Sequence, residues 1–181
     1  CVVIGGGPVA QRKALTLLRY GARVTVISPT ATRRLVTAGA GGTLRYVPRR
    51  FLTTDLRGAW LVYAATDEPA VNARVFRAAN RLKIFANGVD QKPLCSFIAP
   101  AIVQRGQLTI AISTGGRSPS LAKQLRRELE GTLGHRYAPM LRLLADVRGI
   151  TKRTLPSSYA RKRYFERLVR AIAQFSQNLL G

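Results

Sequence analysis

Closely spaced glycines near the start of the chain are the first residues whose pattern indicates chemistry. Gly5, Gly7 and Ala10 fit the spacing Gly-x-Gly-x-x-Ala directly after the apolar run of residues 1–4. In dinucleotide-binding proteins the first glycine permits a tight turn, the second lets the backbone approach a pyrophosphate, and the small third residue lets helix pack on strand. The amino end of the helix would then face the phosphates. The pattern predicts a dinucleotide site, although a glycine turn without a ligand has the same spacing.

A second part of such a site is expected at the end of the next strand. Ser28, Pro29 and Thr30 occupy the place where many dinucleotide-binding folds carry an acidic residue that binds the ribose hydroxyls. Hydroxyl groups can bind a ribose, but they do not strongly repel a 2′-phosphate. Arg33 and Arg34 follow closely, so the choice between NAD and NADP stays open.

Acidic residues are scarce, which makes their positions informative. Between Glu68 and Glu128 the chain has one carboxylate, Asp90, just after the expected fifth strand. Ligands of doubly wound folds lie at the carboxyl ends of the strands, where Asp90 would reach them. An ionised carboxylate can accept a proton or bind a hard metal ion. The alternative is a simple turn before Lys92 and Pro93.

A glycine-rich loop, residues 113–119, leads into another expected helix. Ser118 suits the N-cap of that helix and Pro119 its first position. The backbone amides of the loop could bind an anion, or the loop could be an ordinary capped connection.

Earlier in the chain, Thr66 and Asp67 follow the fourth expected strand and border the cofactor site. For Asp67, a role as N-cap of the next helix is favoured.

Charge is the most unusual property of the 181-residue chain. Thirty Lys and Arg residues face eight Asp and Glu residues, a net charge of +22, and 24 of the thirty are Arg. The excess is spread along the chain, with +12 in residues 1–112 and +10 in residues 113–181. Such a chain should attract nucleic acid, anionic lipid or a highly carboxylated small molecule. A solvated basic surface explains the same excess.

The chain has too few histidines and cysteines for a zinc-binding protein of the Cys/His type or for a disulfide-rich protein. One histidine, His135, and two cysteines, Cys1 and Cys95, exclude an ordinary Cys/His zinc site and any disulfide framework beyond one bridge. His135 is expected to be solvated or to cap a helix, and Cys95 to be a packed residue. No apolar run approaches the roughly 20 residues of a membrane helix. These features favour a cytoplasmic setting.

The elements that would position these residues follow from hydrophobic patterning. Apolar runs at residues 1–4, 23–27, 44–47, 59–65 and 84–86 predict strands that alternate with helices, which is typical of a parallel doubly wound α/β sheet. Strands are then expected at 96–99, 101–104 and 108–112, with helix from Tyr137 onward. Because residue 1 lies inside the first strand, we expect residues before it in the natural protein. The last segment has apolar residues at helical spacing: Phe165, Leu168, Val169, Ile172 and Leu179.

Several of these blocks, in the same order, resemble the precorrin-2 dehydrogenase / sirohydrochlorin ferrochelatase family, the N-terminal module of siroheme synthases. The matching blocks cover residues 1 to about 130, and the last two are far more specific than the glycine pattern. They are residues 3–10 with 12–14, residues 64–67 with Asn72, residues 87–90, residues 97–101, and residues 110–119 with 121–122. Gly88 departs from the family, in which a larger apolar residue is common.

The resemblance implies a Rossmann-like NAD-binding domain at 1–95, a hairpin and helical dimerisation region at 96–136, and a small helical domain at 137–181. It implies NAD-dependent oxidation of precorrin-2 to sirohydrochlorin, followed in bifunctional members by Fe²⁺ insertion, and a homodimer in which the region after the hairpin exchanges between subunits. Asp90 matches the family's catalytic aspartate and would also deliver Fe²⁺. Thr114 matches a serine that can be modified in some members.

The expected contacts divide into two sets. Ten residues are expected at the cofactor: Gly5, Gly7, Pro8, Val9, Ala10, Ser28, Pro29, Thr30, Ala65 and Thr66. Five are expected at the polycarboxylate tetrapyrrole: Asn87, Ser113, Thr114, Gly115 and Arg117. Two other functions remain open: a non-catalytic NAD-sensing regulatory domain, which leaves Asp90 and the 113–119 loop unexplained, and a basic nucleic-acid-binding protein, for which no recognised motif is present. No membrane and no specific nucleic acid are expected as partners.

Overall fold

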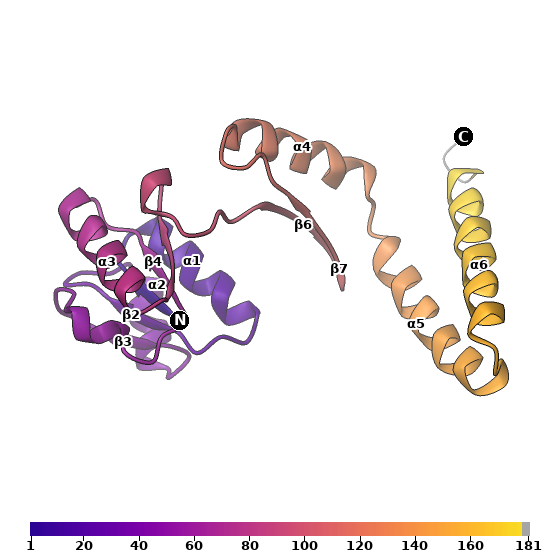
Figure 1. Ribbon diagram of the computed structural model, residues 1–181, viewed down its shortest axis with the longest axis horizontal. Helices are drawn as coiled ribbons and strands as arrows, with labels where there is room; N and C mark the ends of the chain where they lie inside the picture. Colours follow the sequence, from indigo (N-terminus) through magenta and orange to yellow (C-terminus); the bar gives the residue numbers. More distant parts are fainter. Residues whose placement is uncertain (179–181) are drawn as a thin grey trace. The chain divides into compact units, whose positions relative to one another are not determined.

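The computed structural model describes residues 1–178, with side chains as far as residue 172, and the chain forms two compact units (Figure 1). The first comprises Cys1–Ala99 with Gly115–Arg117, and the second comprises Pro100–Thr114 with the chain from Ser118 onward. Among the described helices, none has a stretch long and apolar enough to cross a membrane.

The first unit contains a five-stranded sheet in the order β3-β2-β1-β4-β5, with every neighbouring pair parallel. At its centre Val3 of β1 pairs with Val26 of β2 and Tyr63 of β4. This confirms the predicted doubly wound α/β fold. Its strands are β1 (Val2–Ile4), β2 (Thr25–Ile27), β3 (Arg45–Val47), β4 (Leu61–Ala64) and β5 (Phe85–Gly88). Its helices are α1 (Pro8–Arg19), α2 (Arg33–Ala40), α3 (Pro69–Arg81) and the short 3₁₀ helices η1 (Thr53–Leu56) and η2 (Lys92–Leu94).

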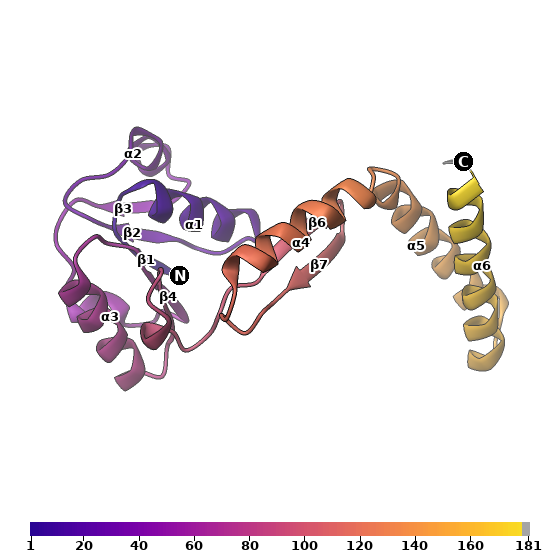
Figure 2. The same cartoon turned by 90° about the horizontal axis from the view of Figure 1, so that it is seen from above.

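Helices cover the sheet on both faces, which explains why the central strands are apolar throughout. Figure 2 shows α1 and α2 on one face and α3 on the other. Successive side chains of a strand point to opposite faces, so Val3 packs with Ala10 and Leu35 in one cluster, whereas Ile4 packs with Val75 in the other. All five side chains are almost completely buried. This packing fixes the carboxyl ends of the strands.

The second unit begins with an antiparallel hairpin, β6 (Ala101–Arg105) and β7 (Leu108–Ile112), as the sequence predicts. Helices α4 (Pro119–Thr132), α5 (Tyr137–Thr154) and α6 (Ser158–Asn178) follow. The predicted cap of α4 is confirmed, because the Ser118 hydroxyl accepts a hydrogen bond from Leu121 N at 3.2 Å. Arg105 ties the hairpin to the end of α4 by donating to the carbonyls of Glu130 (2.7 Å) and Leu133 (2.8 Å).

Three local expectations are corrected. Residues 96–99 are not a strand: the Ser96 hydroxyl accepts the Ala86 N–H at 2.8 Å, so a side chain replaces the carbonyl that would continue the ladder. Asp67 does not cap α3, because Glu68 is the N-cap and its N–H donates to the Thr66 hydroxyl at 3.3 Å. The helical tail is interrupted between α5 and α6 at a segment that contains Pro156, which lacks the N–H that helix continuation needs.

Two further expectations are not tested. Leu179, the last member of the terminal apolar pattern, lies outside the described residues. The domain boundaries at 1–95, 96–136 and 137–181 stay a prediction.

Candidate functional site

A cleft of about 560 Å³ lies at the carboxyl ends of β1, β2, β4 and β5. Its walls are the glycine turn (residues 5–9), the segment after β2 (residues 28–32), the segment after β4 (residues 65–68), and Val89 with Asp90 after β5. The cleft therefore combines the glycine turn with the carboxylate that the sequence singles out. This is the edge of a parallel sheet at which ligands bind in doubly wound folds.

Within the turn, the three glycines meet different surroundings. Gly5 has a φ of +119°, and a Cβ there would overlap the Ala65 carbonyl oxygen. A Cβ at Gly6 would overlap the Thr30 carbonyl oxygen. A Cβ at Gly7, by contrast, would meet no atom within 4 Å. Gly5 and Gly6 thus let three chain segments approach closely, while Gly7 leaves open space in the cleft wall.

The amino end of α1 begins at this open position. Gly7 is the N-cap and makes no side-chain hydrogen bond, and Pro8 occupies the first turn, where its missing N–H leaves no donor unsatisfied. The first turn has no acidic residue, so the positive end of the helix dipole is not neutralised locally. Ala10 is fully buried and lets α1 pack against the sheet. An anionic group fits here.

The segment after β2 is held against the glycine turn by hydrogen bonds. Thr32 N donates to the Gly6 carbonyl at 2.9 Å, and the Thr32 hydroxyl donates to Gln11 Oε1 at 2.7 Å. Ser28 is buried, whereas Pro29 and Thr30 are exposed along the cleft. The structure places all three predicted residues of this segment at the cleft.

A buried asparagine fixes the segment after β4. Asn72 of α3 is 2% exposed; its amide donates to the Thr66 carbonyl at 2.9 Å, and its Oδ1 accepts the Thr66 hydroxyl at 2.8 Å. Ala65 N donates to the Ile4 carbonyl at 2.8 Å, next to the glycine turn. Ala65 and Thr66 therefore line the cleft in a fixed position.

Asp90 lies in a turn that other groups hold in place. Its side chain is exposed, and its φ of +58° is a left-handed conformation that Asp adopts more readily than most residues. Gln91 N donates to the Gly88 carbonyl at 3.2 Å, closing the turn. The Cys95 thiol donates to the carbonyls of Gly88 (3.2 Å) and Gln91 (3.4 Å). The packing role predicted for Cys95 is thus to support the Asp90 turn.

Asn87 and Gly88 of β5, which precede Asp90, also help to hold the Asp90 turn in place. The Asn87 amide donates to the Phe97 carbonyl at 2.9 Å, which ties β5 to the segment that follows η2. A Cβ at Gly88 would lie 2.8 Å from Leu94 Cβ, so Leu94 takes the space that a side chain at position 88 would need. The family departure at Gly88 therefore has a local packing reason. Asn87 is buried and supports the site, and its predicted contact with substrate stays a proposal.

Sequence reasoning missed one charged group near this site. Lys13 of α1 places its ammonium 4.7 Å from the centre of the Tyr63 ring, which in turn packs edge-on against Phe97 at 5.9 Å. Burial and the neighbouring Arg12 charge lower the pKa of Lys13, against the opposing effect of Asp90 and Cys95. Lys13 lies among long polar residues on a helix, and nothing in the sequence indicates contacts with residues 50 and more positions away.

The loop predicted to contact substrate belongs partly to each unit. Gly115 and Arg117 fall in the first unit, and Ser113 and Thr114 in the second. The Thr114 hydroxyl donates to the Ser118 carbonyl at 3.0 Å and accepts the Ser118 N–H at 3.2 Å, so it closes the loop at the start of α4. His135 lies exposed between α4 and α5. Within residues 1–178, no group of three or more His, Cys, Asp or Glu side chains could hold a metal ion.

Families and proteins that resemble this chain match it over most of its length. Residues 1–101 match a family described as putative NAD(P)-binding, and residues 105–132 match one described as the central part of the sirohaem biosynthesis protein. A siroheme synthase of Methylococcus capsulatus is 44% identical over 167 residues, which are 92% of this chain and 35% of that protein. Siroheme synthase 3 of Aeromonas hydrophila is 41% identical over 170 residues, 94% of this chain and 36% of that protein.

A solved structure agrees with these relatives. SirC, a precorrin-2 dehydrogenase, is 30% identical, superimposes with a TM-score of 0.75, and is matched over 90% of this chain and 80% of its own. The present chain spans about a third of the length of the siroheme synthases it matches. The resemblance found in the sequence is confirmed, and the chain belongs to the precorrin-2 dehydrogenase / sirohydrochlorin ferrochelatase family.

Proposed function

We propose that this chain catalyses the NAD-dependent oxidation of precorrin-2 to sirohydrochlorin, a step of siroheme biosynthesis. The observation that carries the proposal is that one cleft joins the open Gly7 turn to the Asp90 carboxylate. Family membership adds the chemistry, because SirC is a precorrin-2 dehydrogenase and the similar longer proteins are siroheme synthases. A nicotinamide cofactor follows from the NAD(P)-binding family, and NAD is the form we propose.

The residues present fit a dinucleotide. Gly7 leaves room for a pyrophosphate, and the amides at the start of α1 would bind it. Ser28, Pro29 and Thr30 would flank the adenosine ribose, while Ala65 and Thr66, held by Asn72, would form the opposite wall. A bound nicotinamide supplies the acceptor for a hydride from a substrate carbon.

Asp90 would remove the proton that accompanies this oxidation. The loss of two electrons and two hydrogens from the macrocycle leaves one proton for a base, and an exposed carboxylate in a turn fixed by Cys95 can accept it. The Asp90 turn is held before substrate arrives, which limits the reorganisation needed at the moment of reaction. In this proposal Asp90 is the catalytic residue.

Substrate attraction would come from the net charge of +22, since precorrin-2 carries many carboxylates. Arginine guanidinium groups suit paired contacts with carboxylates, and we propose Asn87, Ser113, Thr114, Gly115 and Arg117 as the contacting residues.

We further propose a homodimer through the second unit, and Fe²⁺ insertion into sirohydrochlorin with Asp90 delivering the ion. A single carboxylate suits passage of a substrate ion better than its storage.

The experiment is anaerobic mixing of the protein, NAD and precorrin-2, followed by absorbance. The proposal predicts reduced nicotinamide and the sirohydrochlorin chromophore in equal amounts, and a further protein-dependent change after Fe²⁺ is added if the chelatase step is present. Binding of NAD with no reaction would contradict the enzymatic proposal and favour a regulatory domain. Tight nucleic-acid binding that weakens steeply with salt, without turnover, would favour the nucleic-acid alternative.

A further inference from the structure

The wall of the cofactor cleft that follows β2 has an unusual charge distribution. The carboxylates that line the cleft, Asp67, Glu68 and Asp90, all follow β4 or β5. The segment after β2 contributes residues 28–32, none of which is acidic. In NAD-binding folds an acidic residue at this place binds the 2′-hydroxyl of the adenosine ribose, whereas a nearby arginine accommodates the 2′-phosphate of NADP. The segment after β2 thus lacks the acidic group that would repel a 2′-phosphate at this place.

A smaller cavity of about 200 Å³ adjoins this wall. It shares Gly5, Ser28, Pro29, Thr66 and Glu68 with the cofactor cleft, so the two spaces are neighbours that have these wall residues in common. Its remaining walls include apolar residues of the sheet and of α3, and two arginines, Arg50 and Arg74. Arg50 therefore lines the same cavity as Ser28 and Pro29, although it belongs to the segment after β3.

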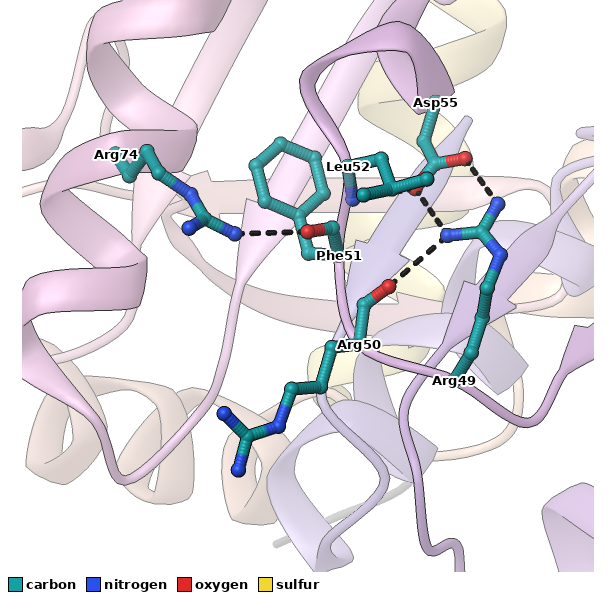
Figure 3. A network of polar contacts seen from close by, with 6 residues as sticks. All are labelled: Arg49, Arg50, Phe51, Leu52, Asp55 and Arg74. Atoms are coloured by element: carbon teal, nitrogen blue, oxygen red, sulfur yellow. Dashed lines mark hydrogen bonds and ion pairs between the residues drawn. The ribbon is translucent and has the colours of Figure 1, made fainter.

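The arginines around this segment differ in what they bind (Figure 3). Arg49 forms a paired contact with the Asp55 carboxylate at 2.6 and 2.9 Å. Arg74 donates to the Phe51 carbonyl at 2.7 Å, and its guanidinium lies 5.4 Å from the centre of the Phe51 ring. The Arg50 guanidinium points away from the Arg49–Asp55 pair, and the described part of the chain offers it no hydrogen bond or ion pair.

An uncommitted guanidinium is suited to a phosphate. Its charge is permanent and its planar fork matches two phosphate oxygens. The nearest acid in sequence, Asp55, is already neutralised by Arg49, and Glu68 lies on the segment after β4. The Phe51 backbone next to Arg50 is fixed by Arg74, which limits the ordering needed when a ligand binds.

We propose that the cleft binds NADP as well as NAD, with Arg50 contacting the 2′-phosphate of the adenosine ribose. The proposal rests on the dinucleotide site of the proposed function and adds the residue that sets its tolerance for the 2′-phosphate.

The test is calorimetric titration of the intact protein with four ligands: NAD, NADP, 5′-AMP and adenosine 2′,5′-bisphosphate. Wild-type protein should bind NADP with a Kd within about fivefold of that for NAD, and the bisphosphate more tightly than 5′-AMP. The R50Q variant should weaken NADP and the bisphosphate by about tenfold or more, as expected for one charge-assisted contact, and change NAD and 5′-AMP by less than twofold. The R57Q variant removes an exposed arginine beyond η1, outside both spaces, and should leave all four Kd values unchanged.

Each outcome decides between the two proposals. NAD binding with NADP weaker by a hundredfold or more overturns the role of Arg50 and leaves the proposed function intact. The same conclusion follows if R50Q weakens NADP and NAD equally or weakens neither. Failure of the wild-type protein to bind either dinucleotide overturns both proposals.

Discussion

The first unit buries apolar side chains on both faces of its sheet, whereas the second leaves much of its apolar surface open. Two buried clusters fill the spaces between the sheet and its helices in the first unit. In the second unit, Val103, Ala122 and Thr151 are the buried side chains among those described, while Leu121, Leu143 and Ile150 are half exposed. Burial of apolar surface is the main source of folding free energy. The first unit can therefore hold its elements by itself, and the second needs further cover.

The cofactor cleft lies in the unit with the larger buried core. The glycine turn, the segment held by Asn72 and the Asp90 turn all belong to the unit with the complete core. The second unit would gain its missing burial from a second copy of the chain, in line with the proposed homodimer.

The largest effect is expected in the glycine turn. G5A places a Cβ against the Ala65 carbonyl at a φ that only glycine adopts easily, so the free energy of unfolding of the first unit should fall by roughly 2–6 kcal/mol. G7A, two residues away, meets no neighbour and should cost about 1 kcal/mol or less, as an alanine at an N-cap. Urea unfolding measures both. Equal losses in the two variants would contradict the close approach at Gly5.

Next in size is the support of the segment after β4. N72A removes the partners of Thr66 from a buried position, so the free energy of unfolding should fall by about 2–3 kcal/mol and NAD should bind more weakly. N80A changes an exposed asparagine of the same helix and should shift stability by less than about 0.5 kcal/mol. An N72A protein as stable as N80A would show that this contact does not hold the segment.

A substitution in the second unit tests its need for cover. L143D places a charge on a half-exposed position of α5, where a lone monomer should tolerate it within about 0.5 kcal/mol. If a second copy covers this surface, the dimer Kd should rise about tenfold or more, because a buried unpaired charge is costly. Sedimentation equilibrium gives the Kd. The control is R142Q, which changes the exposed residue next to Leu143. If the dimer Kd of L143D is unchanged, the second copy does not cover this surface of α5.

The smallest effect concerns a salt bridge at the edge of the first unit. Arg49 and the Leu52 N–H hold the pKa of Asp55 below its ordinary range, so the ionised carboxylate stabilises the folded state. D55N should cost about 1 kcal/mol at pH 7. A lowered pKa means that this stabilisation is present above about pH 4 and is lost as pH falls through the pKa of the folded state. Urea unfolding at pH 7 and pH 3 should show the wild-type advantage shrinking at pH 3; an advantage independent of pH would contradict this.

Much of the structure of the first unit could be predicted because the apolar residues of its sequence pattern are the residues that become buried. Strands such as residues 61–64 are apolar throughout since helices cover both faces, and the glycine turn has a spacing dictated by close approach. The position of Asp90 after β5 followed from the same pattern. The interruption between α5 and α6 was also readable from Pro156, although continuous helix was expected.

The errors arise where a side chain competes with the backbone or reaches a distant partner. Ser96 replaces a backbone acceptor with its hydroxyl, which no alternation of apolar residues reveals. At the start of α3, no side chain makes the capping hydrogen bond expected of Asp67; the Thr66 hydroxyl instead accepts the N–H of the N-cap residue Glu68, and the sequence pattern does not distinguish these adjacent polar residues. The contact of Lys13 with Tyr63, and the lack of a partner for the Arg50 guanidinium among the described residues, depend on tertiary packing alone.

The proposed function requires that Asp90 transfers a proton in a cleft that binds the cofactor independently of this residue. Its most direct test is single-turnover oxidation of precorrin-2 by D90N, with NAD affinity measured on the same sample and D67N, which alters another cleft carboxylate, as the control. We expect the rate with D90N to fall by about a hundredfold or more, its NAD affinity to stay within twofold, and D67N to keep most of the wild-type rate. A D90N rate equal to that of D67N would show that Asp90 does not transfer the proton.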